Sequence, residues 1–182
     1  MNDFFVTSVL ALVVATCTAN TTKGDLQKAL DTKGRIWTVM RSFIRQGESG
    51  THTCIYAWNG TLNGDTYTFD QYYKEGENWK TLSLQGTLSE DSGLNRGVLT
   101  VSTPKKETAG IRYTLEYWDG SQHCGILKFT QSDIPQCEVH VWEDHVSSGY
   151  ENCERVYEEY CGLSTHKHTV YNAGCLNQGQ PR

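Results

Sequence analysis

This sequence of 182 residues lacks the signatures of common enzymes and the long apolar runs of membrane-spanning helices. It contains no G-x-S-x-G, no H-E-x-x-H and no C-x-x-C, so the usual hydrolase and zinc-site motifs are absent. Its apolar stretch from Phe4 to Ala15 is shorter than the roughly 20 residues that span a bilayer. The net charge of −5 argues against a nucleic-acid partner. We therefore expect neither an enzyme, nor a membrane protein, nor a nucleic-acid-binding protein.

The N-terminal segment is typical of a secretory signal peptide. Its apolar stretch is followed by Cys17-Thr18-Ala19, which are small residues where a signal peptidase would cut. The segment departs from the usual pattern because it has Asp3 and no Lys or Arg before the apolar stretch. A membrane anchor is the alternative, but the stretch is too short for it. We predict a signal peptide at residues 1–19 and a single secreted domain at residues 20–182.

The cysteine count fits an oxidising compartment. The chain has seven cysteines, and removal of Cys17 with the signal peptide leaves an even number. Six cysteines in a secreted domain imply three disulfides, whose pairing does not follow from spacing alone. The six are Cys54, Cys124, Cys137, Cys153, Cys161 and Cys175. Two N-glycosylation sequons begin at Asn20, the first residue after the predicted cleavage, and at Asn59, in a turn-like Asn-Gly context.

Short runs of β-forming residues, separated by turns rich in Gly, Asn, Asp and Ser, fill most of the chain. A short helix with Asp25 as its cap and Leu30 as its end precedes them. Eight consecutive strands predict an all-β, antiparallel up-and-down barrel, and a β-sandwich is the alternative. We predict strands at residues 35–44, 53–58, 66–74, 79–84, 97–102, 111–118, 123–129 and 137–142.

The periodicity changes near residue 147, where a helical pattern begins. Aromatic and cysteine residues recur at helical spacing in a Glu-rich stretch. They are Tyr150, Cys153, Tyr157 and Tyr160. Ser148 and Glu151 have the spacing of a capping box, and Gly162 is a typical helix end. Cys153 and Cys161 lie about 80° apart around this amphipathic helix, so both can face the barrel wall.

Histidines beyond this helix form a weak metal-binding pattern. His166 and His168 could bind a metal ion together, but two histidines on either side of a lysine are more often part of a solvated loop. We therefore predict no metal ion and no other cofactor.

Four segments carry a resemblance to a known family. They are Cys124-Gly125-Ile126, the run Cys-Glu-Val-His-Val-Trp at 137–142, the helix near Cys153 and the run Thr-Val-Tyr-Asn-Ala-Gly-Cys at 169–175. In these segments the sequence resembles the tick salivary lipocalins, including the histamine-binding proteins. The resemblance implies an eight-stranded lipocalin barrel with the C-terminal helix packed on its outside. It also implies the disulfides Cys54–Cys175 and Cys124–Cys153, with Cys137–Cys161 as the remaining pair.

The same resemblance implies a ligand site inside the barrel. Amine-binding members of the family look like Cys-Asp-aliphatic on one strand and Glu-Leu-aromatic on the next. Glu138 matches the glutamate, but Gly125 stands at the aspartate position and His140 at the aromatic one. The missing carboxylate weakens the amine interpretation, because a buried ammonium needs opposite charge. Asp70 or Glu116 could substitute for it.

Strand alternation places Glu138, His140 and Trp142 on one face of the last strand and Val139 and Val141 on the other. If the two valines pack under the helix, the other three side chains line the cavity. The alternative is that Glu138 and His140 face solvent while the valines fill the core.

Aromatic residues provide further candidates for the cavity wall. Trp37 and Tyr117 have apolar bodies and polar tips that suit an amphipathic ligand, although most aromatic residues in such a chain simply form the core. Alternation in the first strand puts Trp37, Val39 and Phe43 on one face. We include Trp37 and Tyr117 among the predicted ligand-binding residues.

Together these features predict a secreted, monomeric lipocalin that is not an enzyme. We expect it to sequester a small hydrophobic or amphipathic ligand, such as a sterol, fatty acid or eicosanoid, and to modulate host immune or inflammatory responses. The host-directed role is implied by the resemblance alone. One alternative is a scavenger of histamine or serotonin, which would need at least two inward carboxylates. Another is an immunomodulator that contacts a host immune protein or cell surface through exposed loops.

Overall fold

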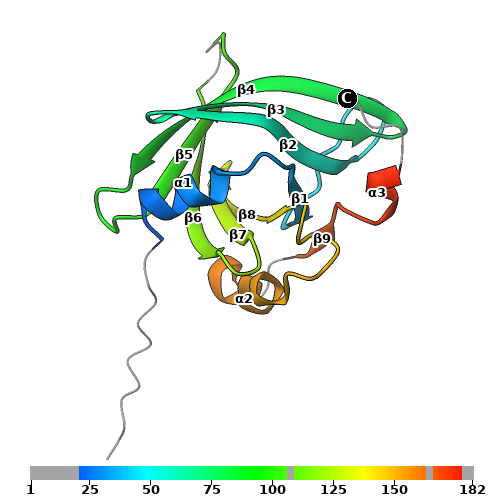
Figure 1. The fold of residues 1–182 in the computed structure, drawn as a ribbon. Helices are drawn as coiled ribbons and strands as arrows, with labels where there is room; N and C mark the ends of the chain where they lie inside the picture. Colours follow the sequence, from blue (N-terminus) through cyan, green and yellow to red (C-terminus); the bar gives the residue numbers. More distant parts are fainter. Residues whose placement is uncertain (1–20, 106–108, 163–165, 178–182) are drawn as a thin grey trace, which may run out of the picture.

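A computed structural model describes the chain over residues 21–105, 109–162 and 166–177. Eight antiparallel strands follow one another and close into a barrel, because β1 pairs with both β8 and β2 (Figure 1). The predicted up-and-down barrel is confirmed, and the alternative sandwich is wrong. The strands are β1 (Ile36–Arg41), β2 (His52–Asn63), β3 (Thr66–Glu75), β4 (Asn78–Glu90), β5 (Gly97–Ser102), β6 (Ile111–Asp119), β7 (Cys124–Gln131) and β8 (Ile134–Trp142).

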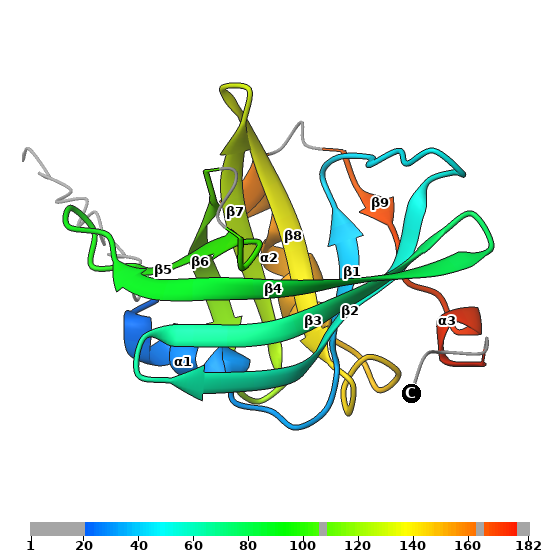
Figure 2. The ribbon, with the colours of Figure 1, turned by 90° about the horizontal axis from the view of Figure 1, so that it is seen from above.

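Strand β1 closes the barrel with an irregular register. Its first half pairs with β2, and its last two residues pair with the short strand β9 (His168–Thr169), which lies beside it in Figure 2. The pairing with β8 shifts between Thr38 and Met40. This bulge interrupts the alternation of side chains between the two faces of the strand, because the extra residue turns the side chains that follow it to the opposite face. As a result, Thr38 and Arg41 both face the barrel interior.

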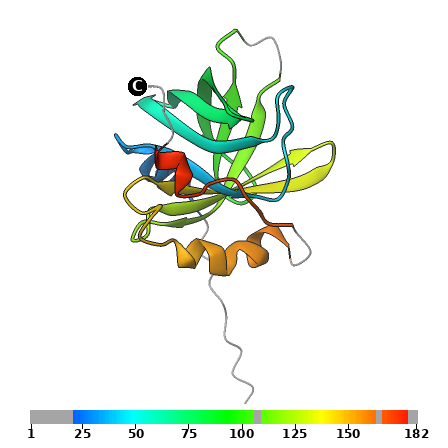
Figure 3. The same ribbon diagram turned by 90° about the vertical axis from the view of Figure 1, so that its right-hand side faces the viewer.

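Two hydrophobic cores lie on opposite sides of the barrel wall. The inner core fills part of the barrel with Leu26, Tyr67, Phe69, Leu88, Leu99 and Leu115. The outer core lies between the wall and helix α2 (Glu151–Cys161), which packs along β6, β7 and β8 (Figure 3). It includes Trp37, Val39, Tyr56, Ile126, Val139, Val141, Val156 and Tyr157. The predicted helix on the outside of the barrel is therefore confirmed.

Helix α1 (Lys23–Leu30) covers one end of the barrel, where Leu26 inserts into the inner core with 1% of its surface exposed. The sequence places its cap at Asp25, but the cap is Thr22. The Thr22 hydroxyl accepts a hydrogen bond from the backbone N–H of Asp25, and the Asp25 carboxylate accepts one from the backbone N–H of Thr22. Asp25 is thus the third residue of a capping box.

Helix α2 begins without the predicted capping box. Its N-cap is Tyr150, which makes no side-chain capping bond, and the Ser148 hydroxyl donates instead to the carbonyls of Asp144 and His145 in the preceding turn. The end is as predicted, since Gly162 caps the helix with a φ of 106° that favours glycine. None of the helices in the described part of the chain is long and apolar enough to cross a membrane.

Three disulfides tie the C-terminal segments to the barrel wall. Cys54 is joined to Cys175 in the short helix α3 (Gly174–Asn177), Cys124 to Cys153, and Cys137 to Cys161. These are the pairs that the resemblance implies. The Cα atoms are 5.3, 6.2 and 5.9 Å apart, within the range of ordinary disulfides. The bridges hold α2 and the C-terminal turn against the outer core.

Two strands are longer than predicted because glycines inside them do not break them. Strand β2 continues through Asn59 and Gly60 with a register shift, and Asn59 has a φ of 55°. Asn59 therefore lies at a bulge within a strand and not at a turn. Strand β4 continues through Gly86, where a Cβ atom would lie 2.6 Å from Leu99 Cδ1. A larger residue there would push Leu99 of the inner core aside, so glycine lets the core approach the backbone closely.

Candidate ligand-binding site

A cavity of about 230 Å³ lies inside the barrel. This volume is somewhat below the range for small-molecule sites, which is about 300–1,000 Å³. Most of its wall is apolar and comes from β1, β2, β3, β4, β5, β6 and β7. The apolar lining includes Ile36, Ala57, Tyr67, Phe69, Leu82, Leu84, Leu99, Val101, Tyr113 and Leu127. The cavity is suited to the hydrocarbon or aromatic part of a small ligand.

A charged cluster occupies one side of this apolar cavity. Arg41 and Glu138 are directly opposite each other on β1 and β8, and Arg41 Nε lies 2.9 Å from Glu138 Oε1. His140 Nε2 lies 3.0 Å from the other carboxylate oxygen, Oε2. Arg41 and Glu138 are both nearly completely buried. The carboxylate of Glu138 therefore has a partner on each of its oxygens.

These partners keep Glu138 charged. Burial disfavours the charged form, but the positive charge of Arg41 and the hydrogen bond with His140 outweigh it and lower the pKa of Glu138 to about 2. Glu138 is the one carboxylate that lines the cavity within the described ranges. Its negative charge is balanced by Arg41, so little of it is left to attract a cationic ligand.

Arginine provides the unpaired polar group of the cavity. Arg41 Nε and Nη1 are both buried and make no hydrogen bond among the described residues, since the 2.9 Å approach of Nε to Glu138 is an ion pair without hydrogen-bond geometry. Its guanidinium lies 5.0 Å from the ring centre of Phe43, a contact that satisfies none of its N–H groups. Arg45 is exposed and also lines the cavity. With two arginines and one carboxylate, the lining favours a ligand that carries a hydrogen-bond acceptor or a negative charge.

Three of the predicted ligand-binding residues face the barrel interior. Glu138 and His140 line the cavity, and Val139 and Val141 pack under α2 in the outer core. Trp142 lies at a second hollow of about 40 Å³ beside α1, where its indole N–H donates to the carbonyl of Ala29 at 2.9 Å. Trp142 therefore forms part of the floor of the barrel and does not line the main cavity.

Trp37 and Tyr117 do not line the cavity, so the prediction for these two residues is corrected. Trp37 is completely buried on the outer side of β1, where its ring packs against Tyr56 and Tyr171. Tyr117 faces α2, and its ring centre is 5.7 Å from that of Tyr160. Strand alternation correctly placed Trp37 and Val39 on the same face of β1. That face points away from the cavity and is covered by α2 and the C-terminal segment.

The acids that could replace the missing aspartate lie elsewhere. Asp70 accepts hydrogen bonds from Ser83 and Asn59 and does not line the cavity. Glu116 forms an ion pair with Arg96 and likewise does not line it. At Gly125 a Cβ atom would lie 3.1 Å from a backbone oxygen, so a larger side chain would be crowded. No second carboxylate joins Glu138 in the cavity among the residues with described positions.

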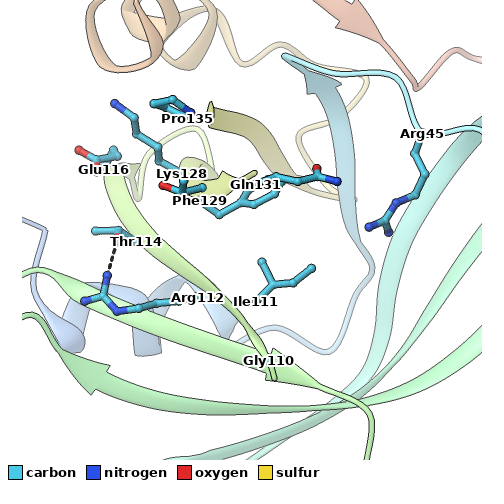
Figure 4. A pocket seen from close by; sticks show the side chains of 11 residues that line it. Arg45, Gly110, Ile111, Arg112, Thr114, Glu116, Lys128, Phe129, Gln131 and Pro135 are labelled. Carbon is cyan, nitrogen blue, oxygen red and sulfur yellow. Dashed lines mark hydrogen bonds between the residues drawn. The ribbon is translucent and has the colours of Figure 1, made fainter. Parts of the chain in front are cut away.

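An open hollow of about 650 Å³ adjoins the cavity where β6 and β7 separate (Figure 4). The two strands pair only from Thr114 and Lys128 onward. Arg45 and Ile111 line both the hollow and the cavity, so the two are neighbours. The side chains of Arg112, Lys128 and Glu116 line the hollow, so it carries both positive and negative groups (Figure 4). The hollow therefore opens beside the cavity on the side of the barrel.

The predictions missed Arg41 and Arg45, which supply the positive charge of the cavity. The one signal in the sequence is an arginine at the end of an otherwise apolar strand, Ile36–Arg41. Strict alternation from Trp37 would place Arg41 on the outer face. The bulge after Thr38 reverses this orientation.

Comparison with known families gives one match that spans most of the chain. Residues 14–177 match the family model described as tick histamine binding protein. A search of curated protein sequences gives no significant match.

Several solved structures share the fold at low sequence identity. AM182 in complex with serotonin has a TM-score of 0.56 and 14% identity, and the match covers 79% of this chain and 85% of AM182. Japanin from Rhipicephalus appendiculatus, bound to cholesterol, has a TM-score of 0.53 and 13% identity, with 79% and 97% covered. H1 crustacyanin from the lobster Homarus americanus has a TM-score of 0.53 and 11% identity, with 88% and 92% covered. At these identities the similarity establishes the barrel fold alone.

Proposed function

This chain belongs to the tick histamine-binding protein family, and on that premise we propose that it sequesters a small amphipathic molecule in its barrel. Its family consists of lipocalins that bind ligands and are not enzymes. We propose a lipid with a negatively charged or hydrogen-bond-accepting end, such as a fatty acid or eicosanoid, as the preferred ligand class. Capture is stoichiometric, and the affinity comes from apolar burial less the cost of ordering the ligand.

The observation that carries this proposal is that Arg41, which lines the cavity, has a buried Nη1 group without a hydrogen-bond partner in the described part of the chain. A buried donor without a hydrogen bond costs roughly 1–3 kcal/mol. A ligand carboxylate or hydroxyl that accepts this hydrogen bond recovers that cost. The apolar wall then holds the rest of the ligand, and Arg45 lies at the exposed edge of the same cavity.

Amine scavenging is the second candidate function. It is supported by Glu138 and His140 in the cavity, by the family name and by AM182, a structural relative in complex with serotonin. Against it, an ammonium group would have to compete with Arg41 for Glu138. A buried ammonium without its own counter-charge is costly. A third proposal, contact with a host protein through exposed loops, rests on the resemblance alone.

The test of the ligand class uses protein secreted from eukaryotic cells. Native mass spectrometry followed by organic extraction should identify a bound fatty acid or eicosanoid. Arg41→Gln should weaken binding of that lipid at least tenfold, because a charge-assisted hydrogen bond is worth roughly 1.5–3 kcal/mol. Arg35→Gln is the matched control, since Arg35 pairs with Glu143 outside the cavity. Equal affinities of the two variants, or an empty barrel that binds only histamine or serotonin, would contradict the proposal.

Secretion and modification belong to the same proposal. We propose that residues 1–19, which lie outside the described residues, form a signal peptide, and that residues 20–182 form one secreted, monomeric domain. Asn59 is exposed at the bulge of β2, which suits a glycosylation acceptor. Asn20 lies outside the described residues. Capture of a lipid mediator in host tissue would lower the inflammatory signal that it carries.

A further inference from the structure

Three side chains that can bind metals meet outside the barrel cavity. His123 lies in the turn before β7, and Asp144 and His145 lie in the turn after β8. His123 Nδ1 is 3.1 Å from His145 Nδ1 and 3.1 Å from Asp144 Oδ2. His145 Nδ1 is 3.0 Å from Asp144 Oδ1. Two ring nitrogens and a carboxylate thus form a compact triangle.

Hydrogen bonds alone do not satisfy this triangle. A carboxylate only accepts, and a neutral imidazole carries one proton on one of its two nitrogens. If one Nδ1 is protonated, it can donate to the carboxylate or to the other ring, and the remaining contact joins two lone pairs. If both Nδ1 atoms are protonated, both can donate to Asp144, but two N–H groups then face each other at 3.1 Å. A cation at the centre of the triangle satisfies all three contacts.

We propose that His123, Asp144 and His145 bind a divalent transition-metal ion, with Zn²⁺ as the best fit. Zinc binds imidazole nitrogen and carboxylate oxygen at about 2.0–2.2 Å in a tetrahedron, which places neighbouring ligand atoms about 3.3–3.6 Å apart. The observed separations of 3.0 and 3.1 Å need only a small expansion. Imidazole ligands favour Zn²⁺ over Ca²⁺ or Mg²⁺.

The two turns are held in place by groups that do not bind the ion. The disulfide Cys124–Cys153 follows His123 directly, and the His123 carbonyl accepts a hydrogen bond from the backbone N–H of Trp142 at 2.9 Å. The carbonyl of Trp142 in turn accepts hydrogen bonds from His145 and Val146. Little conformational entropy therefore remains to be lost when an ion binds.

His123 has an unusual backbone conformation, and its ring is held against a neighbouring side chain. His123 has a φ of 45°, which residues other than glycine seldom adopt. Its imidazole packs on the indole of Trp142, with ring centres 4.1 Å apart. Backbone conformations of this kind persist where the surrounding structure maintains them, often at functional sites.

The site is open to solvent and separate from the lipid cavity. The side chains of His123 and His145 are each 28% exposed, and that of Asp144 is 58% exposed. An ion can therefore reach the triangle, and a water molecule or an external ligand can complete its coordination. None of the three residues lines the cavity, so the ion would act by joining the two turns beside the barrel floor.

The test is a Zn²⁺ titration of the full secreted protein, without an affinity tag, after treatment with a chelator. Isothermal calorimetry should give one Zn²⁺ ion per chain, and Zn²⁺ should raise the melting temperature, because an ion that binds only the folded state stabilises it. Co²⁺ in place of Zn²⁺ should give the visible absorption of a tetrahedral site. Absence of a one-to-one binding event would overturn the proposal.

Matched histidine variants locate the site. His145→Gln and His123→Gln should each weaken Zn²⁺ binding at least tenfold. His166→Gln should leave it unchanged, because the exposed His166 is not part of the triangle and its ring instead lies near that of His168, with ring centres 5.9 Å apart. His145→Gln is the principal variant, since it lies farther in sequence than His123 from the Cys124 disulfide. Wild-type Zn²⁺ affinity in His145→Gln, or loss of binding in His166→Gln, would contradict the assignment.

Discussion

The two faces of β8 differ in chemistry although their residues alternate along one strand. Val139 and Val141 face outward and are completely buried against α2. Glu138 and His140 face inward and share a cavity with Arg41. The outer face is closely packed and cross-linked, while the inner face keeps empty space and a buried donor without a partner. The comparison indicates that the outer core supplies stability and that the inner face is free to serve binding.

The largest expected effect concerns the outer core. The double variant Cys54→Ala/Cys175→Ala should lose about 4 kcal/mol of unfolding free energy, because this bridge spans 121 residues and restricts the unfolded chain most. Urea unfolding measures the loss. At a temperature where the variant is folded, its lipid affinity should stay within about threefold of the wild type. A loss of unfolding free energy below about 1 kcal/mol, or a large loss of lipid affinity in the folded variant, would contradict the conclusion that the outer core supplies stability and the inner face supplies binding.

Glu138→Gln tests the inner face. The substitution keeps the shape of the side chain and removes the charge that balances Arg41. Affinity for a fatty acid should rise several-fold, because Arg41 is then free to pair with the ligand carboxylate. Affinity for histamine or serotonin should fall more than tenfold if amines bind here, since a charge-assisted hydrogen bond is worth roughly 1.5–3 kcal/mol. Calorimetry with both ligand classes measures the two changes.

The control for this variant is Glu143→Gln, which removes a charge from an ion pair with Arg35 outside the cavity. It should change neither affinity. If Glu138→Gln leaves amine binding unchanged, Glu138 is not an amine anchor. If it weakens fatty acid binding, Arg41 is not the group that receives the carboxylate.

The pH dependence of stability sharpens the comparison further. The pKa of Glu138 in the folded protein is about 2, below the ordinary value of 4.5, so the folded state binds fewer protons at this group than the unfolded state. Its stabilising contribution is therefore fully present above about pH 5 and is lost as the pH falls through 4.5 toward 2. Urea midpoints measured from pH 6 to pH 2.5 should fall more steeply in the wild type than in Glu138→Gln. Parallel profiles would mean that Glu138 contributes no stability at neutral pH.

The smallest expected effect distinguishes Trp37 from the cavity residues. Trp37→Phe should cost about 1–2 kcal/mol of stability, because it leaves a small void among Tyr56 and Tyr171 in the outer core. Ligand affinity should not change, since Trp37 lies on the far side of the wall. Thermal unfolding and a fluorescent fatty-acid displacement assay measure the two quantities. A large loss of affinity with unchanged stability would return Trp37 to the binding site.

Much of the fold was predictable because it depends on local patterns. Alternation and turn residues located all eight strands, and β5 has the predicted bounds of Gly97–Ser102. The helix that ends at Gly162 followed from its aromatic and cysteine spacing. The predicted ends of β2 and β4 were wrong, because both strands continue through the positions Asn59 and Gly86, where the sequence suggests a break. There the neighbouring strands continue the pairing, so tertiary contacts override local preference.

The candidate site was predictable only in part. The family resemblance and strand alternation together placed Glu138 and His140 inside the barrel. Trp37 and Tyr117 were assigned to the cavity for their chemistry, but chemistry alone does not distinguish a pocket from a core. The meeting of His123 with Asp144 and His145 depends on two turns that are adjacent only in the folded chain.

The sequence by itself determined the alternating barrel, the outer helix and the two chemically distinct faces of β8, because these depend on periodicity within each element. Only the tertiary structure decided that Arg41 faces inward and neutralises Glu138. That outcome depends on a single bulge in β1, which shifts its register against β8 after Thr38. A one-residue shift moves a side chain to the other face of a sheet, and only the packing of the neighbouring strands can select that shift.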